Sequence, residues 1–405
     1  MSKKHKRIEP KYVPSKHQLS RWQRQTRIQR IIIIAAAVFL AGIIGYVGYG
    51  YYNDKIKPLH QTVIEVNDTS FTMGYYVNML EAYAKLVQPS QVYYMADIVA
   101  SQIVQDELVR QGADSLGIKI TAQEIEAKIE ENKLPNEEVY RDIVAAGLLR
   151  ENLQEYFASQ LPGKMEQSYI QVMLVESQEV ADGVVAKIES GGNFTALVEE
   201  FSCYPTIEGD LGWLPLELMP NPLIAEAAFN PDSGGVNKIY DESVSKSVGY
   251  WLIEVVDKNE EKGIKARVML LGSEQEAWEI RTRLSKGEDF AEMAEEHSQH
   301  ESKDNGGELD WLKPGDMNSE AFDEVAFDLP LAEVSEPVQD KSVQTTAGYW
   351  IVEVLENGEH ELSQDVREKL KTKHFNEWFQ EQWKSSTINN YLDEEKKSWA
   401  VNKLV

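Results

Sequence analysis

The feature that most constrains this chain is an uncharged apolar stretch near its start. Residues Ile31 to Tyr52 read IIIIAAAVFLAGIIGYVGYGYY, 22 positions without a charged side chain. As an α-helix rising about 1.5 Å per residue, the stretch is roughly 33 Å long, which is enough to cross the hydrocarbon core of a bilayer. Tyr46, Tyr49 and Tyr51 gather at one end, where amphipathic rings favour the membrane interface. The sequence therefore predicts a transmembrane helix at residues 31–52, with a buried core helix as the alternative.

The charges on either side of this stretch differ in sign. Residues 1–30 hold ten Lys or Arg and one acid, a net charge of +9, which leaves the rest of the chain at −35 in a total of −26. Positive residues beside a span are retained in the cytoplasm. We therefore predict a basic cytoplasmic tail at residues 1–30, a single pass through the cytoplasmic membrane, and an extracytoplasmic bulk after residue 52. Such an acidic bulk excludes nucleic acid as a partner.

Three small features limit the alternatives. A cleaved signal peptide fits less well, because the apolar stretch is long and no small-x-small cleavage site ends it. Ala37, Ala41 and Gly45 are spaced so that two such helices could pack, which leaves a homodimer open. Cys203 is the only cysteine, so an intrachain disulfide and a thiolate metal cluster are both excluded.

Residues 62–165 are expected to form a strand pair followed by four or five helices. The segment VIEVNDTSFT has two β-like runs around the Asn67-Asp68 turn. Met95, Val99 and Ile103 then recur at the spacing of a helix face. Further on, Thr121 followed by Glu124 forms a capping box that opens another helix.

An internal repeat organises the chain from residue 168 to residue 357. VMLV at Val172 recurs as VMLL at Val268, an offset of 96. Trp213 and Met219 recur as Trp311 and Met317 at an offset of 98, and GYW at 249–251 recurs at 348–350 at an offset of 99. Landmarks that drift so little predict two copies of one α+β domain, at residues 168–258 and 264–357.

Both regions resemble known families. VIEVNDTSFT and GADSLGIKITAQEIEAKI resemble stretches of the N-terminal domain of SurA-like and PrsA-like folding factors. The second repeat shows ARVMLL, GEDFAEMAEEHS, GGELDW and GYWIV, and the first shows QVMLV, GGNFTALVEEFS, GDLGW and GYWLI. These resemble the parvulin (PpiC, rotamase) peptidyl-prolyl isomerases. The resemblance implies an α+β chain with a transmembrane helix, a SurA-like helical domain, two tandem parvulin-like domains and C-terminal helices.

The parvulin resemblance also implies a site. Prolyl peptide rotation needs no metal or cofactor, because an enzyme only has to bind the twisted amide better than the planar one. The family grips the proline ring with Leu, Met and Phe, whose positions fall on Leu309, Met317 and Phe322 in the second repeat. In the first repeat, Leu211 and Met219 match, while the Phe position is an isoleucine.

The polar cluster of the family is largely replaced. Its first-strand histidine falls on Val172 and Val268, and its closing-strand histidine falls on Trp251 and Trp350, which we count as substrate-binding candidates. His300 occupies the position of the family's Cys or Asp and is the candidate catalytic residue. The plainer interpretations remain open: core packing for the methionines and tryptophans, and a solvated loop histidine.

The C-terminal segment, residues 362–405, is expected to be helical. Val366, Leu370, Trp378, Phe379 and Trp383 line one broad face. The SurA-like resemblance implies that this face packs on the helical chaperone domain, with an exposed client-binding face as the alternative.

Three functions follow as hypotheses. The first is an isomerase acting on proline-containing segments of unfolded exported polypeptides, chiefly through the second repeat. The second is a holdase chaperone without catalysis, which the loss of both histidines favours. The third is an anchored scaffold that grips one dedicated partner.

Overall fold

A computed structural model describes residues 16–85, 87–204, 209–230 and 235–404. Residues 1–15, half of the expected basic tail, lie outside the described residues. The chain divides into two compact units, one of Met1–Phe157 with His374–Val405 and one of Ala158–Lys373. We call them the helical unit and the sheet unit and describe each by itself.

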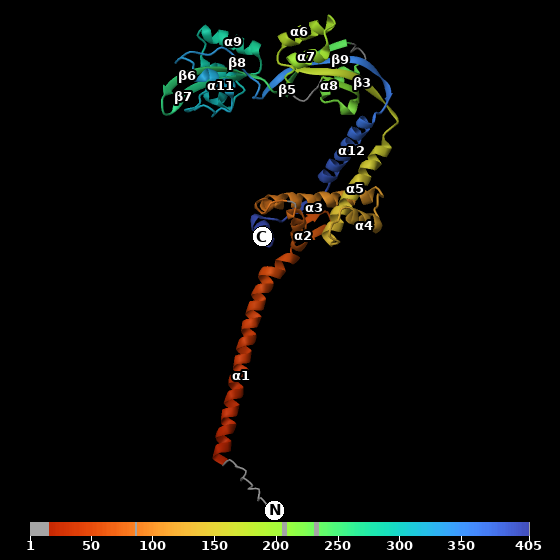
Figure 1. The fold of residues 1–405 in the computed structure, drawn as a ribbon, viewed down its shortest axis with the longest axis vertical. Helices are drawn as coiled ribbons and strands as arrows, with labels where there is room; N and C mark the ends of the chain where they lie inside the picture. Colours follow the sequence, from red (N-terminus) through yellow and green to blue (C-terminus); the bar gives the residue numbers. More distant parts are fainter. Residues whose placement is uncertain (1–15, 86, 205–208, 231–234, 405) are drawn as a thin grey trace, which may run out of the picture. The chain divides into compact units, whose positions relative to one another are not determined.

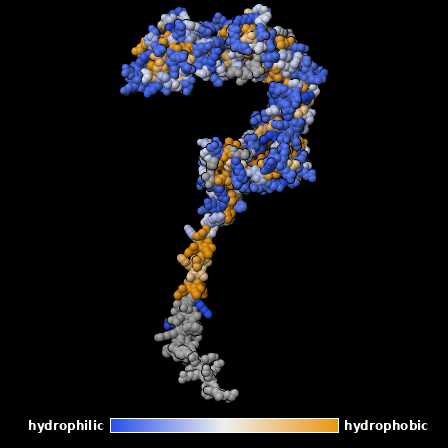
Figure 2. All heavy atoms as spheres, viewed as in Figure 1, coloured by the Kyte–Doolittle hydropathy of each residue, from blue (hydrophilic) through white to orange (hydrophobic). Residues whose placement is uncertain are grey.

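The apolar stretch lies in one long helix. Helix α1 (Lys16–Tyr51) is followed by the short turns η1 (Tyr52–Ile56) and η2 (Lys57–His60). The apolar side chains of α1 are exposed, Phe39 at 70% and Ile44 at 69%, and Figure 2 shows them as a hydrophobic column. By length and composition residues 32–60 can cross a membrane, although a signal sequence near an N-terminus passes the same test. Exposure along the column argues against a soluble core helix, which would be buried.

The helical unit begins with the expected strand pair. Strands β1 (Thr62–Val66) and β2 (Thr69–Thr72) form a hairpin whose turn holds Asn67 at φ 53°, a left-handed conformation that Asn tolerates. Four α-helices and a short turn then follow along the chain: α2 (Met73–Ala84), η3 (Pro89–Gln91), α3 (Val92–Ser115), α4 (Ala122–Glu131) and α5 (Glu138–Gln160). The predicted capping box of Thr121 and Glu124 is present at the start of α4.

The C-terminal residues complete the core of this unit. Helix α12 (Gln364–Ser385) places Phe375 and Trp378 in one cluster with Val109 of α3 and Leu153 of α5. The contact is close, because a Cβ on Gly112 would lie 2.3 Å from the Trp378 ring. Strand β10 (Ile388–Asn390) then pairs with β1, and helix α13 (Glu394–Val401) ends the chain.

The sheet unit contains two sheets with helices on both faces. Its first half comprises β3 (Lys164–Val175), α6 (Gln178–Glu189), α7 (Phe194–Phe201), β4 (Asp210–Pro215), η4 (Leu216–Leu218), α8 (Pro222–Phe229) and β5 (Gly235–Lys246). Its second half comprises β6 (Gly249–Asn259), β7 (Gly263–Leu271), α9 (Glu274–Ser285), α10 (Phe290–His297), η5 (Glu301–Asn305), α11 (Glu320–Ala326), β8 (Val338–Asp340) and β9 (Thr345–Glu361).

The closing strands of the two repeats are exchanged. One sheet has the order β4-β3-β9-β5 and the other has the order β7-β6-β8. Strand β9, which closes the second repeat in sequence, therefore lies between β3 and β5 of the first, as Figure 1 shows. Strand β6, which closes the first repeat, pairs with β7 and β8 of the second. We call residues 164–246 with 345–361 lobe A, and residues 249–340 lobe B.

The short connection between the repeats accounts for this exchange. Only residues 260–262 separate β6 from β7, and Gly263 after them has φ 99°. Such a connection joins antiparallel neighbours as a hairpin, with β6 registered on β7 from Asn259–Gly263 to Tyr250–Leu271. Since β6 is held by this hairpin, the strand position beside β3 is taken by β9.

The two lobes share one strand register. Trp350 lies opposite Leu174 and Ile239 in lobe A. Trp251 lies opposite Leu270 and Val338 in lobe B. Helices α6 and α7 cover one face of the lobe A sheet and α8 the other, while α9 and α10 cover one face of the lobe B sheet and α11 the other.

Candidate functional site

Lobe B gathers three of the predicted pocket residues. Leu309, Met317 and Phe322 belong to one apolar cluster, in which Phe322 is fully buried and the other two are partly exposed. The tryptophan of this cluster is Trp251 from β6 and not Trp350, because of the strand exchange. The side chains therefore converge, but one of them comes from the other repeat.

A glycine turn and backbone hydrogen bonds fix the positions of Leu309 and Phe322. Gly307 has φ 77°, and a Cβ there would lie 2.4 Å from the carbonyl oxygen of Val268, so the turn before Leu309 needs glycine. The Leu309 N–H then donates to the Ala266 carbonyl at 2.9 Å, which holds it beside β7. Phe322 is fixed by the N-cap of α11, where its N–H donates to Ser319 Oγ at 3.0 Å.

A buried carboxylate holds the tryptophan in place. Trp251 Nε1 donates to Asp340 Oδ2 at 3.0 Å, and the Ser319 hydroxyl donates to the same oxygen. Asp340 Oδ1 accepts from the N–H and hydroxyl of Ser342, at 2.8 and 2.6 Å. Burial opposes ionisation of Asp340, but these hydrogen bonds outweigh it and hold the pKa of the carboxyl below its usual value. The buried Asp340 carboxylate thus lies next to the apolar cluster of lobe B.

Lobe A repeats this arrangement. Trp350 Nε1 donates to Asp241 Oδ2 at 3.0 Å, Asn221 Nδ2 donates to that oxygen at 2.8 Å, and Ser243 donates to Oδ1. The pKa of Asp241 is likewise lowered: burial opposes the ionised form, and the donors, Trp350 foremost, overcome it. Sequence reasoning missed both aspartates, although Asp-x-Ser recurs at 241–243 and 340–342 with the offset of 99 shown by GYW.

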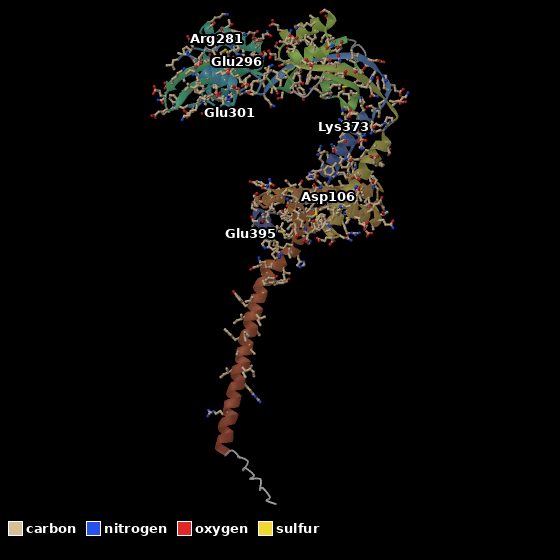
Figure 3. The ribbon with its side chains drawn as sticks, viewed as in Figure 1. Asp106, Arg281, Glu296, Glu301, Lys373 and Glu395 are labelled. Carbon is tan, nitrogen blue, oxygen red and sulfur yellow. The ribbon has the colours of Figure 1, made fainter. Side chains whose placement is uncertain are left out.

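His300 lies against the indole of lobe B. Its ring is 5.4 Å from the Trp251 ring in an edge-on arrangement. The Ser302 N–H donates to His300 Nδ1 at 3.2 Å, so the neutral imidazole carries its proton on Nε2. Burial lowers the pKa of His300, while the neighbouring Glu301 carboxylate, labelled in Figure 3, raises it less. His300 is therefore a half-buried, neutral hydrogen-bond donor at pH 7.

The corresponding apolar residues of lobe A pack against another part of the chain. Leu211 and Met219 pack against the cluster that contains Leu362, Val366 and Leu370, from the segment that enters α12. Leu370 is fully buried there. Tyr204 stands where lobe B has His300, with its ring 5.5 Å from the Trp350 ring. The apolar side chains of lobe A thus have a partner from their own chain.

The single thiol is chemically quiet. Cys203 Sγ lies 3.1 Å from the Leu174 carbonyl oxygen, and burial raises the pKa of the thiol to about 12. A thiol so poorly ionised is a weak nucleophile. Among the described residues, no group of three or more His, Cys, Asp or Glu is placed to hold a metal ion.

Two segments of the chain match models of known protein families. Residues 19–161 match the family model of the SurA-like N-terminal domain, and residues 269–356 match that of the PPIC-type PPIASE domain. The second match ends in β9, so its last strand in sequence belongs to lobe A in space.

Two relatives illustrate the similarity. Chaperone SurA of Dechloromonas aromatica is 29% identical over 268 residues, which cover 60% of this chain and 59% of that protein. Foldase protein PrsA of a Geobacillus species is 39% identical over 114 residues, which cover 28% of this chain and 39% of that protein. The chain thus matches less than two thirds of the length of either relative. The crystal structure of PrsA from Bacillus subtilis, 17% identical with 85% of this chain and 92% of that chain covered, has a TM-score of 0.19, too low to carry an argument.

Proposed function

We propose that this chain, a SurA/PrsA-like parvulin chaperone by its two domain matches and its relatives, is a membrane-anchored foldase that acts outside the cytoplasm. In this proposal lobe B isomerises prolyl bonds of unfolded exported polypeptides, and α1 holds the chain on the membrane. The basic end of α1 then stays in the cytoplasm.

The observation that carries the proposal is the convergence of Leu309, Met317 and Phe322 beside His300. An apolar wall that covers a proline ring removes water from the adjacent amide. The planar amide is stabilised by resonance and by hydration. Removing water therefore reduces the free-energy difference between the planar and the twisted amide. The Nε2–H of a neutral His300 can donate a hydrogen bond to the amide nitrogen. That nitrogen accepts a hydrogen bond more readily in the twisted amide than in the planar one.

We also propose that lobe A is a second parvulin-like domain. Its strands β3-β9-β5 repeat the order and register of β7-β6-β8, and its Trp350–Asp241 pair repeats the Trp251–Asp340 pair of lobe B. Because its Leu211 and Met219 pack against the segment before and within α12, lobe A serves as the support from which lobe B is presented.

A holdase without catalysis is the second candidate, and one observation favours it. Tryptophans occupy both positions at which the parvulin resemblance places a closing-strand histidine. Each indole N–H already donates to an aspartate. Neither tryptophan can therefore donate to a substrate amide. If His300 alone does not support catalysis, the apolar cluster of lobe B would bind prolyl segments without accelerating rotation about their prolyl peptide bonds.

A catalytic assay on the full chain in detergent or nanodiscs separates the two candidates. The rate of cis–trans exchange of a short prolyl peptide is compared for the native chain, the double variant L309A/M317A, and the matched lobe A variant L211A/M219A. We expect acceleration that falls at least about tenfold, or 1.4 kcal/mol, in the first variant and little in the second. A native chain that leaves the exchange rate at background refutes the isomerase, and suppression of client aggregation by that same chain then supports the holdase.

A further inference from the structure

The helical unit contains a cavity that the proposed foldase chemistry does not use. The cavity has a volume of about 310 Å³, near the lower end of pockets that bind small ligands. Strand β2 and helices α2, α3 and α5 line it, and it is open to solvent on one side. Its lining residues are Thr69, Phe71, Tyr75, Ile103, Asp106, Glu107, Arg110, Asp142, Ala145, Ala146 and Leu149.

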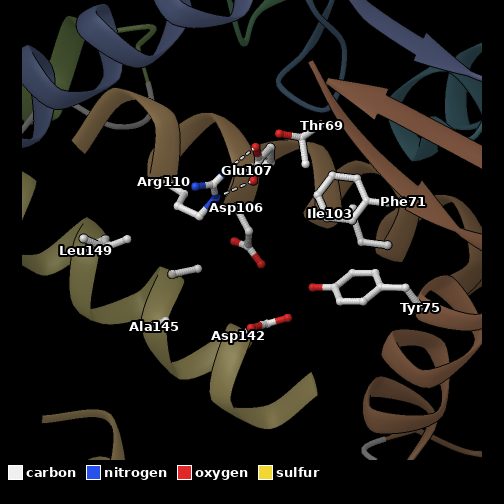
Figure 4. Close-up of a pocket in the computed structure, with 11 residues that line it drawn as sticks. Thr69, Phe71, Tyr75, Ile103, Asp106, Glu107, Arg110, Asp142, Ala145 and Leu149 are labelled. Carbon is white, nitrogen blue, oxygen red and sulfur yellow. Dashed lines mark hydrogen bonds and ion pairs between the residues drawn. The ribbon is translucent and has the colours of Figure 1, made fainter. Parts of the chain in front are cut away.

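The walls of the cavity are of two kinds. Phe71, Ile103 and Leu149 supply apolar surface, and the Phe71 and Tyr75 rings lie 5.2 Å apart. Figure 4 shows the Asp106 carboxylate of α3 and the Asp142 carboxylate of α5 directed into the same space, with the Tyr75 hydroxyl beside them. Asp106 is partly buried and Asp142 is exposed, so the two carboxylates lie at different depths of the pocket. Such an apolar pocket lined by carboxylates suits a cation carried on an apolar side chain.

The cations nearby are already engaged. Arg110 Nε donates to Glu107 Oε2 at 2.7 Å, and Glu107 is buried. Arg150 is 3.7 Å from Asp106 Oδ1, the oxygen that also accepts from Gln102 Nε2 at 2.7 Å. The three acids of the lining thus exceed its single arginine by two charges.

Burial disfavours the ionised form of both carboxylates, and the contacts from Gln102, Arg150 and Tyr75 only partly offset this. Burial raises the pKa of Asp106 to about 6, and the charge of Asp142 adds to that shift. Burial likewise raises the pKa of Asp142, although a hydrogen bond from Tyr75 opposes it. A cation placed between the two would remove this repulsion.

From the cavity, its apolar walls and its two inward carboxylates, we propose that this site binds the arginine side chain of an extended, unfolded polypeptide. A guanidinium is planar, has five donors and is more weakly hydrated than an ammonium, so it can satisfy two carboxylates with a smaller loss of hydration. The Phe71 and Tyr75 rings offer a face on which it can stack. The inference takes the polypeptide nature of the ligand from the proposed function, and it adds the residue that the helical unit selects.

The test measures binding of short proline-free Gly/Ser peptides to the full chain in nanodiscs by fluorescence anisotropy. The peptides carry one central arginine, one lysine, or one citrulline, which is the neutral isostere of arginine. We expect arginine to bind best and citrulline at least about tenfold more weakly, as for a truncated ion pair. Equal binding of the arginine and citrulline peptides overturns the proposal, and so does a preference for lysine.

Variants locate the binding. The double substitution D106N/D142N keeps the shape of the cavity and removes both charges, so it should abolish the preference of arginine over citrulline. D114N, on the exposed side of the same helix, is the matched control and should leave the preference intact. A preference that survives D106N/D142N places the arginine elsewhere and contradicts the assignment. Because the peptides lack proline, these outcomes do not depend on isomerase activity in lobe B.

Discussion

Two single side chains, Trp251 and Trp350, occupy the positions at which the parvulin resemblance places a closing-strand histidine. Each indole packs in the apolar interior and donates its single N–H to a buried aspartate. The tryptophan positions were predictable from the repeat. Their carboxylate partners were harder to predict. Asp-x-Ser recurs at the offset of GYW, but this recurrence does not show that Asp241, within β5, and Asp340, at the end of β8, turn inward.

Replacing each tryptophan by phenylalanine should loosen the lobe in which it packs, not the repeat in which it lies. W251F leaves buried Asp340 one donor short, which should cost about 1–3 kcal/mol of unfolding free energy. Hydrogen exchange should then quicken in β7 and β8. W350F, the matched change, should quicken exchange in β3 and β5, and the opposite assignment would contradict the strand exchange.

The lowered pKa of Asp340 predicts an acid-sensitive lobe B. The folded state binds this proton less tightly than the unfolded chain does, so the stabilisation is complete above the ordinary value of 3.8 and is lost as pH falls toward the lowered folded value. Thermal unfolding between pH 7 and pH 3 should show this loss. D340N should be less stable at neutral pH by about 1–3 kcal/mol and should show a weaker acid dependence. An identical acid dependence in D340N would contradict the assignment.

Among the elements, the exchange of β6 and β9 is what the sequence concealed. The landmarks reveal two copies and their order, but they do not say which opening strand each closing strand joins. The deciding feature is the length of the connection at residues 260–262, which favours pairing of β6 with β7. For the same reason the sequence repeat groups Trp350 with Leu309, whereas the structure places it with Leu211.

The exchange predicts which fragment of lobe B can fold. Residues 248–341 contain β6, β7 and β8, whereas residues 262–358 lack β6 and carry β9 without its partners β3 and β5. Circular dichroism and thermal unfolding should therefore show a cooperative transition for the first fragment and none for the second. A cooperatively folded 262–358 fragment would show that each repeat can close on itself.

For the molecule as a whole, the predicted resemblance to SurA/PrsA-like parvulin chaperones is confirmed by the domain matches. The mixed α and β architecture is confirmed as well. It was predictable because amphipathic helices and capping boxes are local signals in the sequence. The cavity between α3 and α5 was beyond reach from the sequence, since Asp106 and Asp142 read as ordinary solvated positions on two helices until those helices pack.

Membrane attachment is predicted to rest on α1. The full chain should remain with membranes after alkaline extraction, and removal of residues 1–52 should release it. Protease added to the outside of intact protoplasts or spheroplasts should digest the bulk and leave a fragment that contains the first 52 residues. Cleavage of the basic tail instead would reverse the proposed orientation.

In the proposed function, the apolar cluster of lobe B, and not that of lobe A, receives prolyl segments. Site-specific photocrosslinking tests this directly, with p-benzoyl-phenylalanine in place of Met317 in one full-length protein and in place of Met219 in another. Illumination with an unfolded, proline-containing polypeptide should give an adduct at Met317 and little at Met219, where α12 and the segment before it already cover the groove. Adducts of equal yield at both positions, or only at Met219, would show that lobe B is not the preferred binding lobe.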